Sequence, residues 1–146
     1  IVIRAGWMMG GGPAKDKKFI NKIIKQLQAG ATVLSVVDDK LGTPCYTYDL
    51  ARIIEDRLDK KEYGIYHGAC SGAASRYDVA LFMVSQLSLD DKVKVNKVDS
   101  SFFGKDYFAP RPHSEKLLNT KIPHLIRDWK ICLEEYLKKF DWKVTR

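Results

Sequence analysis

Apolar residues recur at intervals of three and four in four segments of the chain. Residues at this spacing share one face of a helix, so the pattern predicts amphipathic helices. The predicted helices cover residues 15–29, 48–59, a segment that starts at residue 75, and 126–140. The positions expected to face inward are Phe19, Ile20, Ile23, Ile24 and Leu27, then Leu50, Ile53, Ile54 and Leu58, then Val79, Phe82, Met83 and Leu87, and last Trp129, Leu133, Tyr136, Leu137 and Phe140.

Between the helices lie short segments rich in β-branched residues. They predict a buried strand over residues 1–8, strands at 32–37 and 64–67, and a half-exposed strand at 93–98. Residues 38–46 contain glycine and proline and are expected to form a loop. Residues 99–124 hold three prolines and are expected to be irregular.

Local signals set some of the helix ends. Gly30 is expected to end the first helix. Ser75 and Asp78 resemble a capping box at the start of the third helix, with Asp in place of the usual Glu. Strands that alternate with helices indicate an α/β fold with mostly parallel strand pairing.

Composition and charge narrow the class of protein. The chain has 146 residues, of which 45% are hydrophobic and 11% aromatic, so it can bury a core and is not expected to be disordered. The sequence contains no apolar run long enough for a membrane span. The net charge of +7 can indicate nucleic acid, but the one aromatic residue among the lysines of residues 15–25 is Phe19, which is expected to face inward rather than to stack on bases. A solvated helix face, or attraction of a small anionic ligand, fits them better.

Cysteine and histidine spacing argues against a disulfide framework or a metal site. Cys45, Cys70 and Cys132 are odd in number and far apart, and the chain has no CxxC motif. The three histidines form no HxxxH or HExxH pair. We therefore expect free thiols in a reducing, cytoplasmic environment.

Familiar catalytic motifs do not appear. Glycines 10–12 follow a predicted strand but match neither GxGxxG nor a Walker A loop, and a plain turn fits them better. Cys70 lies at the centre of a GxCxG, where packing is the simpler interpretation and a nucleophile the alternative.

Two residues are candidates for ligand contact. Trp7 comes at the carboxyl end of a predicted strand, where α/β sheets bind ligands, although a core position is equally compatible. Arg111 lies between Pro110 and Pro112, which stiffen the loop around its guanidinium. A guanidinium held in this way suits bidentate binding of a phosphate, although an ordinary surface position is equally compatible.

Four stretches, in order along the chain, resemble the dTDP-4-dehydrorhamnose reductases, a family of extended short-chain dehydrogenases/reductases. They are the Ile-Arg-Ala-Gly-Trp of residues 3–7, residues 36–46 with the Asp-Leu-Ala of 49–51, the Gly-Ile-Tyr-His of 64–67 with Ser-Arg-Tyr at 75–77, and Arg111 with Pro112, Ser114, Leu117 and Asn119. Trp129 and Leu133 fit the family's last helix.

The resemblance implies that residues 1–146 are the carboxyl-terminal, substrate-binding portion of such an enzyme. The implied fold is a partial Rossmann-like sheet plus a small α/β substrate-binding domain. The chain begins inside a predicted strand without Met, so we expect the dinucleotide-binding half to be absent from it. The parent would use NADPH or NADH to reduce the C4 ketone of dTDP-4-dehydrorhamnose.

The resemblance also implies roles for individual residues. Ala5 and Gly6, where the family has Thr-Ser, would lie near the nicotinamide. Trp7, Lys18 and Arg111 would contact the nucleotide-sugar, with Lys18 in place of a common Asn and Cys45 in place of a Thr. No catalytic residue is expected, because no tyrosine is followed by lysine four positions later.

Three functional hypotheses remain at this point. The first is the substrate-binding part of a nucleotide-sugar reductase, and the second is a non-catalytic regulatory module that binds a nucleotide, which the departures at Ala5, Gly6 and Cys45 favour. The third, nucleic-acid binding, rests only on the net charge. We expect no nucleic-acid or membrane partner, and we expect self-association, as a homo-oligomer, when the chain is isolated.

Overall fold

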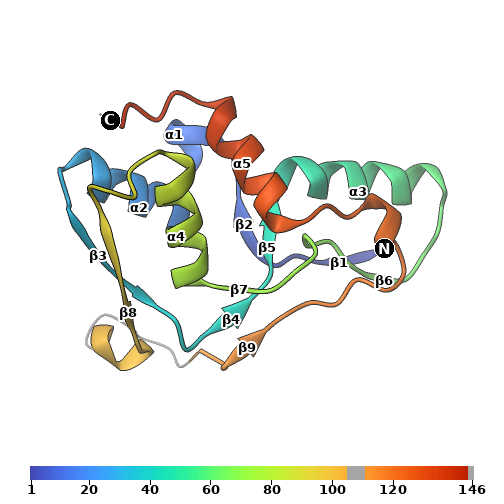
Figure 1. The fold of residues 1–146 in the computed structure, drawn as a ribbon. Helices are drawn as coiled ribbons and strands as arrows, with labels where there is room; N and C mark the ends of the chain where they lie inside the picture. Colours follow the sequence, from blue (N-terminus) through green and yellow to red (C-terminus); the bar gives the residue numbers. More distant parts are fainter. Residues whose placement is uncertain (105–110, 145–146) are drawn as a thin grey trace.

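The computed structural model describes residues 1–104 and 111–144, in which short parallel strand pairs are packed against helices (Figure 1). The helices are α1 (Gly12–Lys15), α2 (Phe19–Gln28), α3 (Thr47–Asp59), α4 (Arg76–Gln86) and α5 (Trp129–Lys139), with 3-10 turns at Ser100–Phe103 and Pro123–Leu125. None of the helices in the described part of the chain is long and apolar enough to cross a membrane.

Most strand pairs are parallel, as the alternation of strands and helices predicts. β1 (Val2–Arg4) pairs with β6 (Ile65–His67), β2 (Trp7–Met9) with β5 (Pro44–Tyr46), and β3 (Val33–Val37) with β8 (Lys94–Val98). β4 (Leu41–Gly42) pairs in parallel with β9 (Ser114–Glu115) and antiparallel with β7 (Ala74–Ser75). The predicted α/β class is confirmed.

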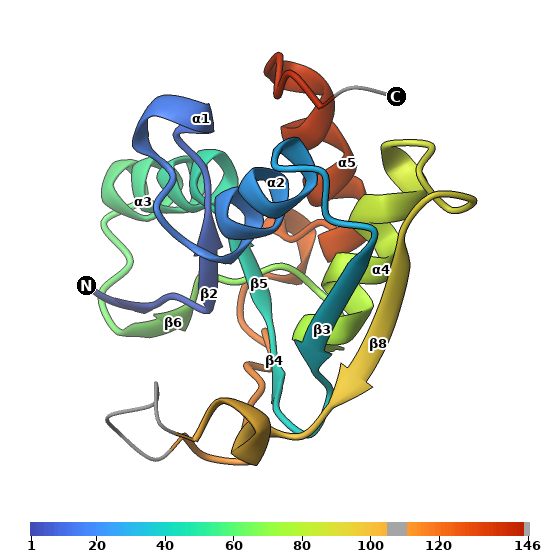
Figure 2. The ribbon, with the colours of Figure 1, turned by 90° about the vertical axis from the view of Figure 1, so that its left-hand side faces the viewer.

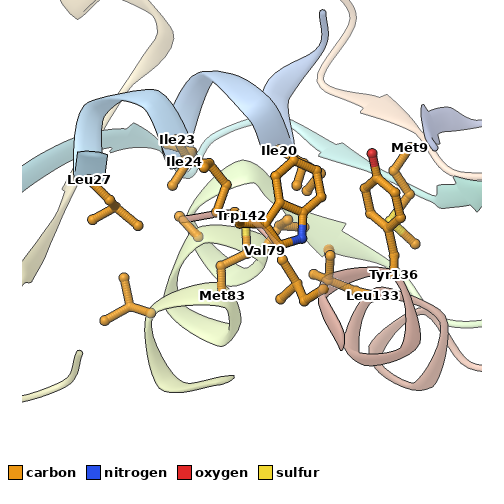
Figure 3. Packing of buried hydrophobic residues seen from close by; sticks show 14 of the residues in the cluster. Met9, Ile20, Ile23, Ile24, Leu27, Val79, Met83, Leu133, Tyr136 and Trp142 are labelled. Atoms are coloured by element: carbon orange, nitrogen blue, oxygen red, sulfur yellow. The ribbon is translucent and has the colours of Figure 1, made fainter. Parts of the chain in front are cut away.

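The main core lies between α2, α4 and α5, and the predicted apolar stripes form it. In Figure 3 the isoleucines of α2 point toward Val79 and Met83 of α4, and Leu133 and Tyr136 of α5 lie beside them. Tyr136 also packs edge-on against Trp142, with ring centroids 5.3 Å apart. The capping box is present: the Asp78 amide donates to the Ser75 hydroxyl at 3.0 Å, and the Ser75 amide donates to the Asp78 carboxylate at 2.8 Å.

The predicted strand over residues 1–8 is two strands that belong to different sheets. The break falls at Ala5 and Gly6, where the chain passes very close to Thr43. A Cβ at Gly6 would lie 2.0 Å from the Thr43 carbonyl oxygen, so only glycine fits, and the Trp7 amide donates to that same oxygen at 2.8 Å. This crossing redirects the chain from β1 to β2.

The loop predicted for residues 38–46 holds for residues 38–40 but is wrong beyond them, because residues 41–42 form β4 and residues 44–46 form β5. Their partners lie far away in the sequence, so their pairing leaves no local pattern. The irregular structure predicted for 99–124 holds for much of the described part, apart from β9 and the two 3-10 turns, while residues 105–110 lie outside the described residues.

One end of the molecule is less covered than predicted. β1, β6 and α3 lie together at this end, away from the β3–β8 pair, in both views (Figures 1 and 2). Ile53 packs inward with Tyr66 and Ile122, but Ile54 and Leu58, predicted to face inward, are 41% and 59% exposed. The strand predicted to be buried is exposed too, with Val2 at 56%. The described chain places little over these side chains.

Candidate functional site

Trp7 is the centre of a group of side chains drawn from four parts of the chain. It begins β2, three residues after the carboxyl end of β1, and is half-buried. Its indole N–H donates to a Glu115 carboxylate oxygen on β9 at 2.8 Å. The Arg76 guanidinium carbon, at the start of α4, lies 3.9 Å from the centroid of the Trp7 ring. The indole is therefore held by a carboxylate at its edge and a cation on its face.

Gly42 lets strand β4 pass directly against the indole. A Cβ at this position would lie 2.1 Å from Cε2 and 2.2 Å from Cζ2 of Trp7. Carbon atoms in contact are normally about 3.5–4.0 Å apart, so a side chain here would displace the ring or the strand. Gly42 thus fixes the position of Trp7 by close approach.

Arg76 also links Trp7 to the start of α2. Its guanidinium carbon lies 4.9 Å from the centroid of Phe19, the first residue of α2. A guanidinium between two aromatic rings is held in place by cation–π attraction. Arg76 follows a strand and opens a helix, which is the position where α/β proteins meet anionic ligands, and this signal could have identified it.

The structure brings some of the predicted site residues close together. Ala5 and Gly6 form the turn that precedes Trp7. Lys18 is exposed at the N-cap of α2, next to Phe19, and its amide donates to an Asp16 carboxylate oxygen at 2.7 Å. Arg111 is exposed, four residues before Glu115, and its predicted neighbour Pro110 lies outside the described residues.

The motif residues after Arg111 hold their segment against two other parts of the chain. The Leu117 amide donates to the Thr43 hydroxyl at 3.0 Å. The Asn119 side chain donates to the His67 carbonyl, and its oxygen accepts from the Ile122 amide at 3.1 Å. These bonds tie the segment that carries Arg111 to β6 and to the β4–β5 turn, beside Trp7.

A second polar cluster is buried between α3, α5 and the segment after β6. The Arg127 guanidinium donates twice to Asp49, from Nε at 3.0 Å and from Nη2 at 2.7 Å. The Cys132 thiol donates to an Asp49 oxygen at 3.0 Å. The Sγ atoms of Cys70 and Cys132 and one Asp49 oxygen all lie within 4.8 Å of one another. The fold therefore gathers two cysteines that the sequence separates widely.

The cysteines of the chain differ in their proton affinity. The contact with Cys132 lowers the pKa of the Cys70 thiol, whereas the same contact, burial and the neighbouring Asp49 raise the pKa of Cys132. Burial raises the pKa of Cys45 to about 12, and its thiol donates to the Gly68 carbonyl at 2.9 Å. Cys45 is thus a protonated packing group.

A cavity of about 390 Å³ lies at the other end of the main core. It is lined by residues from the ends of α4 and α5 and from the segment that follows α5, among them Gln86, Glu134 and Trp142. Trp7 does not line it. The Trp7 group is therefore separate from this cavity.

Solved structures of nucleotide-sugar enzymes share the fold of this chain. The dTDP-4-dehydrorhamnose reductase of Yersinia enterocolitica superposes with a TM-score of 0.87 at 38% identity, covering 95% of this chain and 49% of that one. The Bacillus anthracis reductase, solved in complex with NADP, superposes with a TM-score of 0.80 at 24% identity, covering 95% of this chain and 48% of that one, which shows the fold. The fold is that of the extended short-chain dehydrogenases/reductases.

The sequence places the chain more narrowly within that class. Residues 1–142 match the RmlD substrate binding domain, and the chain belongs to this family. The dTDP-4-dehydrorhamnose reductase of Mycolicibacterium smegmatis is 31% identical over 139 residues, which are 92% of this chain and 41% of that protein. The chain thus spans less than half the length of these relatives, and the resemblance to this reductase family is confirmed.

Proposed function

We propose that this chain is the substrate-binding portion of a nucleotide-sugar reductase that converts dTDP-4-dehydrorhamnose to dTDP-rhamnose in the cytoplasm. The observation that carries the proposal is the match of residues 1–142 to the RmlD substrate binding domain. The parent protein would contain a second, dinucleotide-binding half. That half would supply the Gly-rich loop and the Tyr-x-x-x-Lys pair that this chain does not contain.

Trp7 is proposed to contact the deoxysugar. An indole offers a rigid apolar face that suits the C–H face of a sugar ring. Arg76 and Glu115 hold the indole from two sides, which prepares it for binding and reduces the entropy lost on association. Trp7 would therefore orient the sugar so that the C4 ketone faces the cofactor.

The diphosphate of the substrate is proposed to meet positive charge around the same group. Arg76 presents a guanidinium beside Trp7, and Lys18 is exposed at the start of α2. Arg111 is proposed as a further diphosphate contact, supported by its segment's bonds to Thr43 and His67. The net charge of +7 favours approach of the anion.

The nicotinamide is proposed to lie against the backbone of Ala5 and Gly6. This turn follows the carboxyl end of a parallel strand, where such sheets bind dinucleotides. Gly6 cannot carry a side chain without striking Thr43, which suits backbone contact with a flat ring. NADPH or NADH supplies the hydride when it is bound, and this chain's contribution is to orient the two reactants.

The exposed end of the molecule supports the proposal that the parent protein has a second, dinucleotide-binding half. Val2 and Ile65 are direct neighbours across the β1–β6 pair and are both exposed, at 56% and 47%. Parallel sheets are normally covered on both faces. We propose that the dinucleotide-binding half packs against this face and along the free edge of β1.

Calorimetry on the full-length protein tests the proposal. We expect dTDP-rhamnose to bind, and we expect Trp7→Ala to weaken its binding about tenfold or more while leaving dTDP binding nearly unchanged, because the indole contacts the sugar. Tyr63→Ala removes an aromatic ring that is 80% exposed outside the Trp7 group and serves as the matched control. Equal effects of the two substitutions would contradict the assignment.

A non-catalytic, nucleotide-binding regulatory module is the second candidate, favoured by the Ala5–Gly6 turn with its missing polar side chains. Such a module would bind dTDP, with or without NADPH, and would not turn over the ketone. Turnover by the full-length protein would exclude it.

A further inference from the structure

The cluster of Asp49, Cys70 and Cys132 has no part in the function proposed above. The three side chains come from α3, from the segment after β6 and from α5, and all three are buried. Two thiols and a carboxylate converge with their ligand atoms within 4.8 Å of one another. Thiolates and carboxylates are ligands of Zn²⁺ and similar cations.

The distances are close to those of a tetrahedral site. With metal–sulfur bonds of about 2.3 Å and metal–oxygen bonds of about 2.0 Å, ligand atoms lie about 3.5–3.8 Å apart. The Cys132 sulfur and the Asp49 oxygen are already 3.0 Å apart. The widest separation, at most 4.8 Å, needs to shorten by only about 1 Å, which side-chain rotation can supply.

Arg127 contributes to the charge balance around such a cation. Two thiolates, one carboxylate and a divalent cation together leave one negative charge, and the Arg127 guanidinium, which donates twice to Asp49 and also pairs with Glu135 at 2.5 Å, lies beside it and offsets part of it. Outer hydrogen bonds of this kind orient a ligating carboxylate. On binding, the cation replaces the two thiol protons, which leave to solvent.

A fourth ligand position is also available. A cavity of about 10 Å³ is lined by Asp49, Cys70 and Arg127, among others. This volume is about what one water molecule needs. A water there would complete four-fold coordination beside two of the three protein ligands.

We propose that Asp49, Cys70 and Cys132 form a binding site for one thiophilic divalent cation, with Zn²⁺ as the natural occupant. The site ties α3 and α5 to the segment after β6, and it does not depend on the nucleotide-sugar function. The prediction of no metal site considers ligands at short spacings, whereas these three ligands are far apart in sequence and meet only in the fold.

Titration of the reduced, metal-free chain with Cd²⁺ tests the proposal. We expect a thiolate-to-cadmium charge-transfer band in the ultraviolet that saturates at one equivalent. Cys70→Ser and Cys132→Ser should each remove most of the band and weaken binding by at least about 10–100-fold, the loss caused by removing even an outer-shell partner. Cys45→Ser is the matched control, since this buried thiol bonds to the Gly68 carbonyl, and it should keep the full band.

A measurement on the unsubstituted chain guards against variants that fail to fold. Zn²⁺ should slow the alkylation of Cys70 and Cys132, followed by mass spectrometry, at least tenfold more than that of Cys45. Absence of the band in the folded, reduced chain, or equal protection of all three thiols, would overturn the proposal. A Cys70–Cys132 disulfide formed on exposure to peroxide, in a chain that binds no cation when reduced, would also overturn it and would identify a redox pair.

Discussion

Gly42→Ala is expected to disrupt the Trp7 group, although the substitution adds a single methyl group. In a strand, replacing glycine by alanine ordinarily stabilises a protein by about 0.5–1 kcal/mol, because the unfolded chain loses freedom. At Gly42 the new Cβ would lie 2.1 Å from Cε2, 2.2 Å from Cζ2 and 2.6 Å from Cδ2 of Trp7. The ring or strand β4 must therefore move by more than about 1 Å to restore ordinary contact distances.

The size of the effect follows from this overlap. Overpacking of this kind costs about 1–3 kcal/mol, which outweighs the intrinsic gain from alanine. A displaced indole also breaks its hydrogen bond to Glu115 and its stacking on Arg76. We expect the sugar nucleotide to bind roughly tenfold or more weakly, the equivalent of about 1.4 kcal/mol.

A double-mutant cycle separates the clash from other effects. Unfolding by urea gives the free energy of unfolding for the parent protein, Gly42→Ala, Trp7→Ala and the double variant. Once Trp7 is alanine, the methyl group at position 42 has room, so in that background Gly42→Ala should show only its intrinsic gain of about 0.5–1 kcal/mol. The cycle should give a coupling free energy of about 1–3 kcal/mol.

The result that refutes this reasoning is additivity. A coupling below about 0.5 kcal/mol would mean that the alanine at position 42 does not press on the indole. Unchanged sugar-nucleotide binding by Gly42→Ala would likewise show that the ring position is not set by β4.

The other predictions concern stability and association. Tyr136→Phe should cost about 1–3 kcal/mol in urea unfolding, because the buried Gly12 amide that donates to the Tyr136 hydroxyl at 3.0 Å loses its acceptor; an unchanged free energy of unfolding would refute this. Asp38→Asn should cost less than about 1 kcal/mol at pH 7, since Lys97 lowers the pKa of the Asp38 carboxyl, and this stabilisation is present above the unfolded pKa of about 3.9 and is lost as the pH falls through the lower folded value. A difference between Asp38→Asn and its parent that is the same at pH 7 and at pH 2 would contradict the assignment. The isolated chain should self-associate in light scattering and Val2→Lys should shift it toward monomer, whereas a monomeric parent chain would contradict the role of the exposed β1 face.

The helices of the main core were predictable because their signal is local. The stripes of α2, α4 and α5 depend only on which residues lie three and four positions apart. The structure buries most of them in the main core and packs the rest, partly buried, against it. The same spacing predicts that Ile54 and Leu58 of α3 face inward, but both side chains are exposed. Periodicity identifies an apolar face, but whether anything covers that face depends on the rest of the protein.

The short strands were not predictable in the same way. β4, β7 and β9 are two residues long, and each exists only because of partners many positions away. Glycine and proline at residues 42 and 44 are typical of loops, and that preference was overridden by pairing. The crossing at Gly6 likewise depends on Thr43, which no local pattern connects to it.

The candidate site also has a part that the sequence predicts and a part that it does not. Trp7 could be singled out because it follows a strand, and the motifs in order along the chain indicated the reductase family. Glu115 carries no such signal, since it reaches the indole from β9. Arg76 could be noticed as the first residue of a helix, but its contact with Trp7 is set only by the fold.

By itself the sequence determined the α/β class, the three core helices, the helix cap at Ser75 and the family. These depend on backbone periodicity, on hydrogen bonds between near neighbours, or on ordered motifs. The tertiary structure decided which strands pair, which faces stay exposed, how Gly42 positions Trp7, and that Asp49, Cys70 and Cys132 meet. Those outcomes arise from contacts between residues far apart in the chain, whose distances are set only when the whole fold has formed.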